Sequence, residues 1–249
     1  MDPSTPVVLS TSGLCRSFGG IRVVDDVAIE VRAGAVLGIV GPNGAGKTTL
    51  LDLLDGVLTP DSGRIELDGA DLTRTPPAQR CRLGIGRTYQ VPRPFAHMTV
   101  FENVLVGAVH GAGLRRRAAH GTALDALTRT GLRGRADLLA GDLRLLDRKR
   151  LELARALAGR PRVLLLDEIA GGLTDGELPE LVALVRELRD DGTAIVWIEH
   201  VLHALAGASD AMLCLASGAV LARGTPDEVL ADETVRRVYL GASVEELER

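Results

Sequence analysis

The sequence predicts an α/β protein with a mostly parallel central sheet, an N-terminal antiparallel β part and an inserted helical subdomain. Apolar runs with the length of buried strands, such as AVLGIV at 35–40 and RVLLLDE at 162–168, alternate with helical patterns. Between these two regions, helical patterning interrupted by glycines continues as far as residue 159. We therefore expect a single domain over 7–249, made of a core (7–90 and 160–225), a helical subdomain (about 91–159) and C-terminal helices (226–249).

Local patterns place the individual elements. Residues 21–31 are rich in β-branched side chains, and RIELDG at 64–69 alternates as a strand does. TTLLDLLDG at 48–56 follows a glycine-rich turn and has a helical pattern. Further elements are an amphipathic helix at 177–192, a strand at 193–200, a hairpin with Ser217-Gly218 at its turn, and terminal helices in 225–241.

Composition excludes several classes of function. With 46% apolar and 25% charged residues, the chain of 249 residues has ordinary globular usage and room for a sizeable core. A net charge of −4 and only 2% aromatic residues give neither a basic footprint nor stacking platforms for nucleic acid. Cys15, Cys81 and Cys214 match no zinc spacing, and their odd number favours a reducing compartment. The start of the chain lacks a signal-peptide pattern, and no apolar run is long enough for a transmembrane helix.

A glycine-rich turn carries the strongest chemical signal. GPNGAGKTT at 41–49 fits the pattern G-x-x-x-x-G-K-[ST] and lies between an expected strand and an expected helix. Glycines let successive backbone N–H groups point at phosphate oxygens, and the helix adds its positive end. Lys47 would reach the β- and γ-phosphates, and the Thr48 hydroxyl would bind Mg²⁺. The residues expected to hold ATP here are Gly41, Asn43, Gly44, Gly46, Lys47, Thr48 and Thr49.

Polar side chains end two further strands. Asp167 and Glu168 follow a buried strand, and a parallel sheet would bring them beside the phosphate turn. There Asp167 would hold Mg²⁺ and Glu168 would polarise the attacking water, whereas the alternative is a helix-capping acid and a surface glutamate. His200 ends the next strand, where it would contact the γ-phosphate; a purely structural histidine is the alternative.

Together these motifs resemble the nucleotide-binding subunits of ABC transporters, over nearly the whole chain. GPNGAGKTT is similar to the Walker A motif of that family, LLLDE to its Walker B motif and IEH to its switch-histidine strand. The resemblance implies a P-loop NTPase core of the RecA-like type. It also implies that Gln90 in GRTYQ senses Mg²⁺ and the membrane partner, and that Phe18 in RSFGG stacks under adenine, unless it is a core residue. Asp175 in GGLTD falls near the D-loop of the family.

Three stretches resemble the branched-chain amino acid branch of the family in particular: SFGG at 17–20, residues 84–107, and residues 224–241. The resemblance implies an ATPase at the cytoplasmic face of the cell membrane that energises an importer of small solutes. Its partners would be integral membrane permease subunits, a solute-binding protein indirectly, and a second ABC ATPase subunit, either a different chain or a second copy. No nucleic acid is expected.

The turn at 143–147 departs from the family. Members bind each ATP between the Walker A of one subunit and a signature turn, usually LSGGQ, of the other; here the aligned residues read LRLLD. Arg144 replaces a serine hydroxyl, and a branched side chain at Leu146 should keep the helix N-terminus away from phosphate. Asp147 would add a repelling charge, which Arg144 could offset. We therefore expect an asymmetric pair with one working site.

Two lesser departures flank the catalytic positions. Ile169 replaces the proline usual after the catalytic glutamate, and Val201 replaces a common aspartate. A mainly regulatory subunit with weak hydrolysis remains an alternative, as does a non-transport ABC ATPase, although the chain has one cassette and no long insert. A GTPase is disfavoured because no N-K-x-D motif is present.

Overall fold

The computed structural model describes residues 5–174 and 176–240, and it has a central six-stranded sheet. The strand order is β11-β10-β4-β9-β8-β7, with parallel pairing except between the hairpin strands β10 and β11. The strands are β4 (Val36–Val40), β7 (Ile85–Arg87), β8 (Val163–Asp167), β9 (Ala194–Ile198), β10 (Ala211–Ala216) and β11 (Ala219–Gly224). Because β4, β8 and β9 are parallel neighbours, their carboxyl ends lie at one edge of the sheet.

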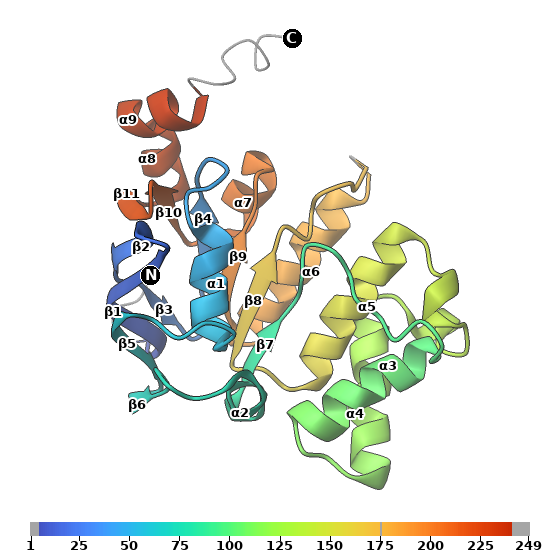
Figure 1. Ribbon diagram of the computed structural model, residues 1–249. Helices are drawn as coiled ribbons and strands as arrows, with labels where there is room; N and C mark the ends of the chain where they lie inside the picture. The colour runs from blue at the N-terminus through green and yellow to red at the C-terminus, as the bar shows by residue number, and fades with distance from the viewer. Residues whose placement is uncertain (1–4, 175, 241–249) are drawn as a thin grey trace.

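A second, antiparallel sheet packs at the N-terminal side (Figure 1). It contains β1 (Val7–Phe18), β2 (Ile21–Val27), β3 (Glu30–Arg32), β5 (Ser62–Leu67) and β6 (Ala70–Asp71). The single strand expected over 21–31 is two strands, interrupted at Ala28 and Ile29. As a result β2 and β3 both pair with β1, in separate registers.

Alternating side chains give the central sheet two buried faces. Leu37, Ile39 and Leu165 face α1 (Lys47–Asp55), whose leucines pack on this side together with the antiparallel sheet. Leu164, Leu166 and the fully buried Trp197 face the other way. That side is covered by α6 (Leu178–Asp190) and α7 (Leu202–Ala208). The apolar runs in the sequence are therefore strands covered on both faces, as in doubly wound α/β proteins.

The chain between β7 and β8 forms a group of helices that lies to one side of the central sheet (Figure 1). Its members, α3, α4 and α5, pack on one another through apolar residues such as Val104, Ala123 and Leu151. The elements of this inserted segment are α3 (Val100–Val106), η1 (Gly107–Gly111), α4 (Arg116–Arg129), η2 (Arg133–Arg135), η3 (Ala140–Asp142) and α5 (Leu145–Ala158). A capping box at Thr99 and Glu102 starts α3.

The remaining elements complete the α/β fold. They are α2 (Pro77–Leu83), α8 (Pro226–Ala231), α9 (Glu233–Val235) and η4 (Arg236–Leu240). The predicted fold class is thus confirmed, with its mostly parallel core, antiparallel N-terminal sheet and inserted helices. In residues 5–174 and 176–240, no helix is both long enough and apolar enough to span a membrane. Asp175 and the last nine residues of the expected terminal helices lie outside the described residues.

Candidate functional site

The glycine-rich turn connects the end of β4 to the start of α1. A Cβ at Gly46, where φ is +99°, would lie 2.3 Å from the carbonyl oxygen of Val23, so only glycine fits there. The first turn of α1 has no side-chain cap and no acidic residue, which leaves its N–H groups free to bind an anion. Local backbone geometry therefore prepares this turn for phosphate.

Lys47 lies against the same turn and is almost fully buried. Its Nζ donates hydrogen bonds to the carbonyl oxygens of Gly41, at 2.7 Å, and Pro42, at 3.0 Å. Burial lowers the pKa of the ammonium, and the nearby carboxylates of Glu168 and Asp167 partly oppose that shift. Phosphate oxygens would compete with these two carbonyls for a cation that has already lost most of its water.

A cavity of about 580 Å³ opens over the turn and brings together most of the expected site residues. Its walls come from five separate stretches: Val23 in β2, the phosphate turn with the start of α1, Gln90 after β7, and the residues that follow β8 and β9. Its lining residues are Val23, Asn43, Gly44, Ala45, Gly46, Lys47, Thr48, Thr49, Gln90, Glu168 and His200. Gly41, Asp167 and Phe18 are not among them. Phe18 is 43% exposed, and the guanidinium of Arg16 lies 4.9 Å from the centroid of its ring.

The carboxylates after β8 differ in environment. Asp167 is buried, and burial raises its pKa although the Arg87 guanidinium opposes the shift. Glu168 has a left-handed backbone, with φ +46°, and its N–H donates to the carbonyl of Ile198 at 2.9 Å. That conformation turns the Glu168 side chain into the cavity. Its carboxylate accepts a hydrogen bond from the Gln90 amide and lies 3.8 Å from Nδ1 of His200.

The same residues offer a set of oxygen donors for Mg²⁺. Thr48 contributes a hydroxyl and Asp167 a carboxylate; the Gln90 side-chain oxygen is available because its nitrogen is the atom bonded to Glu168. Oxygen donors of this kind suit Mg²⁺, which also retains water and binds phosphate. The residues present therefore fit the ion that the sequence predicts.

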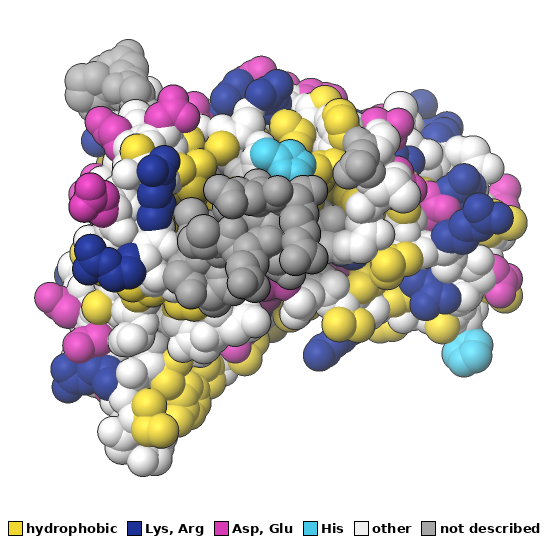
Figure 2. Space-filling model, turned by 90° about the horizontal axis from the view of Figure 1, so that it is seen from above, with side chains coloured by type: hydrophobic (Ala, Val, Ile, Leu, Met, Phe, Trp, Pro, Cys, Tyr) yellow, Lys and Arg dark blue, Asp and Glu magenta, His cyan; other side chains and the backbone are white. Residues whose placement is uncertain are grey.

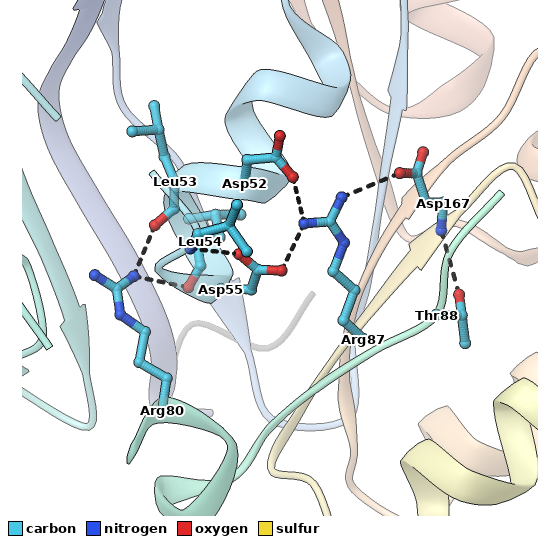
Figure 3. A network of polar contacts seen from close by, with 9 residues as sticks. Asp52, Leu53, Leu54, Asp55, Arg80, Arg87, Thr88 and Asp167 are labelled. Atoms are coloured by element: carbon cyan, nitrogen blue, oxygen red, sulfur yellow. Dashed lines mark hydrogen bonds and ion pairs between the residues drawn. The ribbon is translucent and has the colours of Figure 1, made fainter. Parts of the chain in front are cut away.

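Sequence reasoning missed Arg87, which joins the two phosphate-site motifs (Figure 3). Nη1 of this buried guanidinium lies 2.6 Å from Asp52 and 2.5 Å from Asp55 on α1, and Nη2 lies 3.2 Å from Asp167. Arg80, on α2, donates to the carbonyls of Leu53 and Leu54 and so caps the end of α1. No local pattern indicates this role of Arg87, because its partners lie 32 to 80 residues away along the chain.

The sequence analysis also missed Glu199, because it assigned the role at the end of this strand to the next residue, His200. Its side chain is fully buried, and it accepts hydrogen bonds from the backbone N–H groups of Ala170, at 2.5 Å, and His200, at 3.3 Å. Burial raises its pKa, and these two N–H groups partly offset the shift. Glu199 thus fastens the segment after Glu168 to the segment that carries His200.

The unusual turn at 143–147 begins α5 without a side-chain cap. Arg144 is exposed and Leu145 is 50% exposed, so an apolar side chain occupies the surface at the helix N-terminus. Asp147 differs from expectation: its carboxylate is buried and forms an ion pair with Arg135, so it does not project an unpaired charge. Residues 144–146 still present larger side chains at this helix start than the Ser-Gly-Gly that is usual in the family.

The comparisons with known proteins agree with this geometry. The sequence profile of the ABC transporter family matches residues 24–171, which is more than half of the chain. The chain belongs to the ABC transporter family. A second profile, for branched-chain amino acid ATP-binding cassette transporters, matches residues 219–245.

Relatives of this ABC protein align over nearly its full length. The high-affinity branched-chain amino acid transport ATP-binding protein LivG of Salmonella typhimurium is 40% identical over 250 residues, covering 94% of this chain and 98% of LivG. The lipopolysaccharide export system ATP-binding protein LptB of Escherichia coli is 32% identical over 233 residues, covering 94% and 97%. A crystal structure of the ADP conformation of an ABC transporter cassette has a TM-score of 0.88 and 31% identity, and covers 95% of this chain and all of that one.

These matches confirm the predicted family and enzyme class. The protein is an ATPase subunit of an ABC transporter, and it is close to the ATP-binding proteins of branched-chain amino acid importers. Such cassettes bind ATP, and those of importers dimerise and work with membrane permease subunits.

Proposed function

We propose that this chain is the hydrolysing half of an asymmetric ATPase pair that energises the uptake of a small solute, such as a branched-chain amino acid. The observation that carries the proposal is a contrast within one molecule. The cavity over the phosphate turn has Lys47, Glu168 and His200 in place, whereas residues 144–146 put bulky side chains at the N-terminus of α5. One working site would combine this cavity with the signature turn of a different subunit.

Hydrolysis in that site follows from the positions of the side chains. Lys47 would neutralise charge on the β- and γ-phosphates, and the free N–H groups of α1 would hold them in line with the attacking water. Glu168 would accept a proton from that water, and His200, whose Nδ1 lies 3.8 Å from the Glu168 carboxylate, would orient the γ-phosphate. Mg²⁺ bound by Thr48, Gln90 and Asp167 would supply further charge neutralisation. Phe18 would stack on adenine from outside the cavity.

A groove beside the site supports an interaction with a membrane subunit. About 400 Å³ in volume, it lies between α2, β7 and the helical group, and its lining includes Tyr89, Phe95 and His110. Arg87 lines this groove and also contacts Asp167. A short segment of a permease at the cytoplasmic face of the membrane would fit this aromatic and basic groove. On the face shown in Figure 2, acidic and basic side chains are interspersed.

Steady-state ATPase measurements test the proposal. The purified chain would be assayed alone, then mixed with the second ATP-binding subunit encoded nearest to it, with Glu168→Gln as the control. We expect activity only in the mixture, and its loss with Glu168→Gln by a factor of about 100 or more. Brisk hydrolysis by the chain alone would show that LRLLD still acts as a signature turn. Binding of ATP with little turnover in the mixture would instead support a regulatory subunit.

A further inference from the structure

Lys149 is a buried cation that the mechanism above does not use. It lies on α5, two residues after Asp147, and is 8% exposed. Its Nζ donates hydrogen bonds to three backbone carbonyls within four residues of chain: Glu168 at 3.3 Å, Ile169 at 3.2 Å, and Gly171. All three belong to the segment that begins with the catalytic glutamate.

Hydrogen bonds from two different elements hold the segment 168–171. Lys149 binds its carbonyls from the helical group, while Glu199 accepts the N–H of Ala170 from the end of β9. Gly171 lies between them: a Cβ there would be 3.4 Å from the His200 ring and 3.7 Å from Nζ of Lys149. The backbone that sets the left-handed conformation of Glu168 therefore depends on a side chain from α5.

The other end of the connection is the turn at 143–147. α5 starts at Leu145, so Lys149 stands one helical turn beyond the residues that would face the nucleotide of the second subunit. A displacement of this rigid helix would move Nζ relative to the carbonyls of Glu168 and Gly171. The contact thus joins a surface that belongs to one nucleotide site to the catalytic residue of the other.

We propose that Lys149 is a positioning residue that holds Glu168 in its hydrolytic conformation and couples the start of α5 to it. The coupling between sites rests on the asymmetric pair proposed above; the positioning of Glu168 does not. An ammonium suits this task because it can donate three hydrogen bonds at once to carbonyls that converge on one point. Burial makes each of these bonds stronger than it would be in water.

The positioning claim can be tested on the chain alone. Amide hydrogen exchange of peptides covering 168–173 would be compared between the native chain, Lys149→Met, Lys149→Gln and Lys149→Arg. The Ala170 N–H donates to Glu199, and Lys149 holds the carbonyls on either side of it. Loss of the Lys149 contacts should therefore expose this N–H more often. We expect exchange about tenfold faster in the Met and Gln variants, and near-native exchange with Arg. Arg150→Met is the matched control, since Arg150 is next in the helix and pairs with Glu180 on α6. Unchanged exchange in the Met and Gln variants would overturn the proposal.

Kinetics of the mixture then test whether this positioning of Glu168 matters for hydrolysis. With Lys149→Met we expect kcat to fall by about tenfold while KM for MgATP stays within about twofold, because the phosphate turn is untouched. Lys149→Arg should restore most of kcat. Rates are divided by the concentration of folded chain that binds nucleotide, because a loss of folded chain alone would also lower the apparent kcat at constant KM. On that scale a merely structural lysine leaves kcat within about twofold of native, and that result would overturn the positioning role.

A further pair of variants keeps the two proposals apart. In the Glu168→Gln background, Lys149→Met should cause no additional loss of rate, since both changes act on one group. Independent, additive losses would contradict the link to Glu168. If the native mixture does not hydrolyse ATP, the asymmetric pair fails, whereas the exchange experiment on the chain alone still decides the role of Lys149.

Discussion

Nη2 of Arg87 lies 3.2 Å from Oδ2 of Asp167, and the same guanidinium binds Asp52 and Asp55 on α1 (Figure 3). One cation thus joins the Walker A helix to the Walker B carboxylate. The guanidinium of Arg87 compensates the negative charge of the three carboxylates around it. Burial raises the pKa of Asp55 and Asp167, and Arg87 opposes the shift for both.

Arg87→Met should therefore destabilise the chain. It leaves Asp55 and Asp167 buried without their cation, which costs about 3 kcal/mol in free energy of unfolding, as for other buried pairs that lose one partner. Urea denaturation measures this quantity. Arg64→Met is the control, because Arg64 pairs with Glu66 and Asp71 at the surface and its side chain is 59% exposed. A loss for Arg87→Met as small as the control, about 0.5 kcal/mol, would contradict the structural role.

Gly46→Ala should abolish nucleotide binding. The added Cβ would meet the Val23 carbonyl at 2.3 Å and force the phosphate turn to shift. We expect affinity for ATP to fall by about 100-fold or more, measured by titration with a fluorescent nucleotide. Gly69→Ala is the matched control: Gly69 lies outside the phosphate turn, and its φ is +77°, yet nothing lies within 4 Å of a Cβ there. It should suffer only a backbone cost of about 1–2 kcal/mol, and equal loss of affinity in both variants would refute the steric explanation.

Glu199→Gln should change how stability depends on pH. Burial raises the pKa of Glu199 above its ordinary value of 4.5. Between pH 4.5 and the raised pKa, Glu199 is therefore protonated to a greater extent in the folded chain than in the unfolded chain. Ionisation of Glu199 therefore removes stability with rising pH in that window. Glutamine can still accept the Ala170 N–H but cannot ionise. Denaturant unfolding from pH 4.5 to 7.5 should show the variant gaining stability relative to the native chain; a constant difference would argue against a buried charge.

Restoring glycines at the start of α5 should increase hydrolysis by the chain alone. Leu145→Gly combined with Leu146→Gly removes the side chains that stand where phosphate must approach. We expect at least about a tenfold rise in ATPase rate, at a cost of about 2 kcal/mol in stability for two helical glycines. Asp147 is retained because it already pairs with Arg135. Leu138→Gly, at another exposed leucine, is the control. No rise in rate would show that Arg144 or Asp147 limits the facing site instead.

Much of the site was predictable because its motifs are local. The phosphate turn, Asp167, Glu168 and His200 each follow a strand, and parallel strands carry their carboxyl ends to one edge. Gln90 came from a resemblance, and the structure places its amide on Glu168. Arg87, Glu199 and Lys149 were not predictable, since nothing near them in sequence reveals what they bind.

The sequence by itself determined the family, the fold class and the phosphate turn, because these depend on short patterns and on the order of strands and helices. It also showed that residues 143–147 depart from the family. Only the tertiary structure decided how charges pair: that Asp147 is neutralised by Arg135, that Arg87 joins two motifs, and that Lys149 holds the backbone of Glu168. The physical reason is that electrostatic and hydrogen-bond partners are fixed by distance in space, and these partners lie 12, 80 and 19 residues apart along the chain.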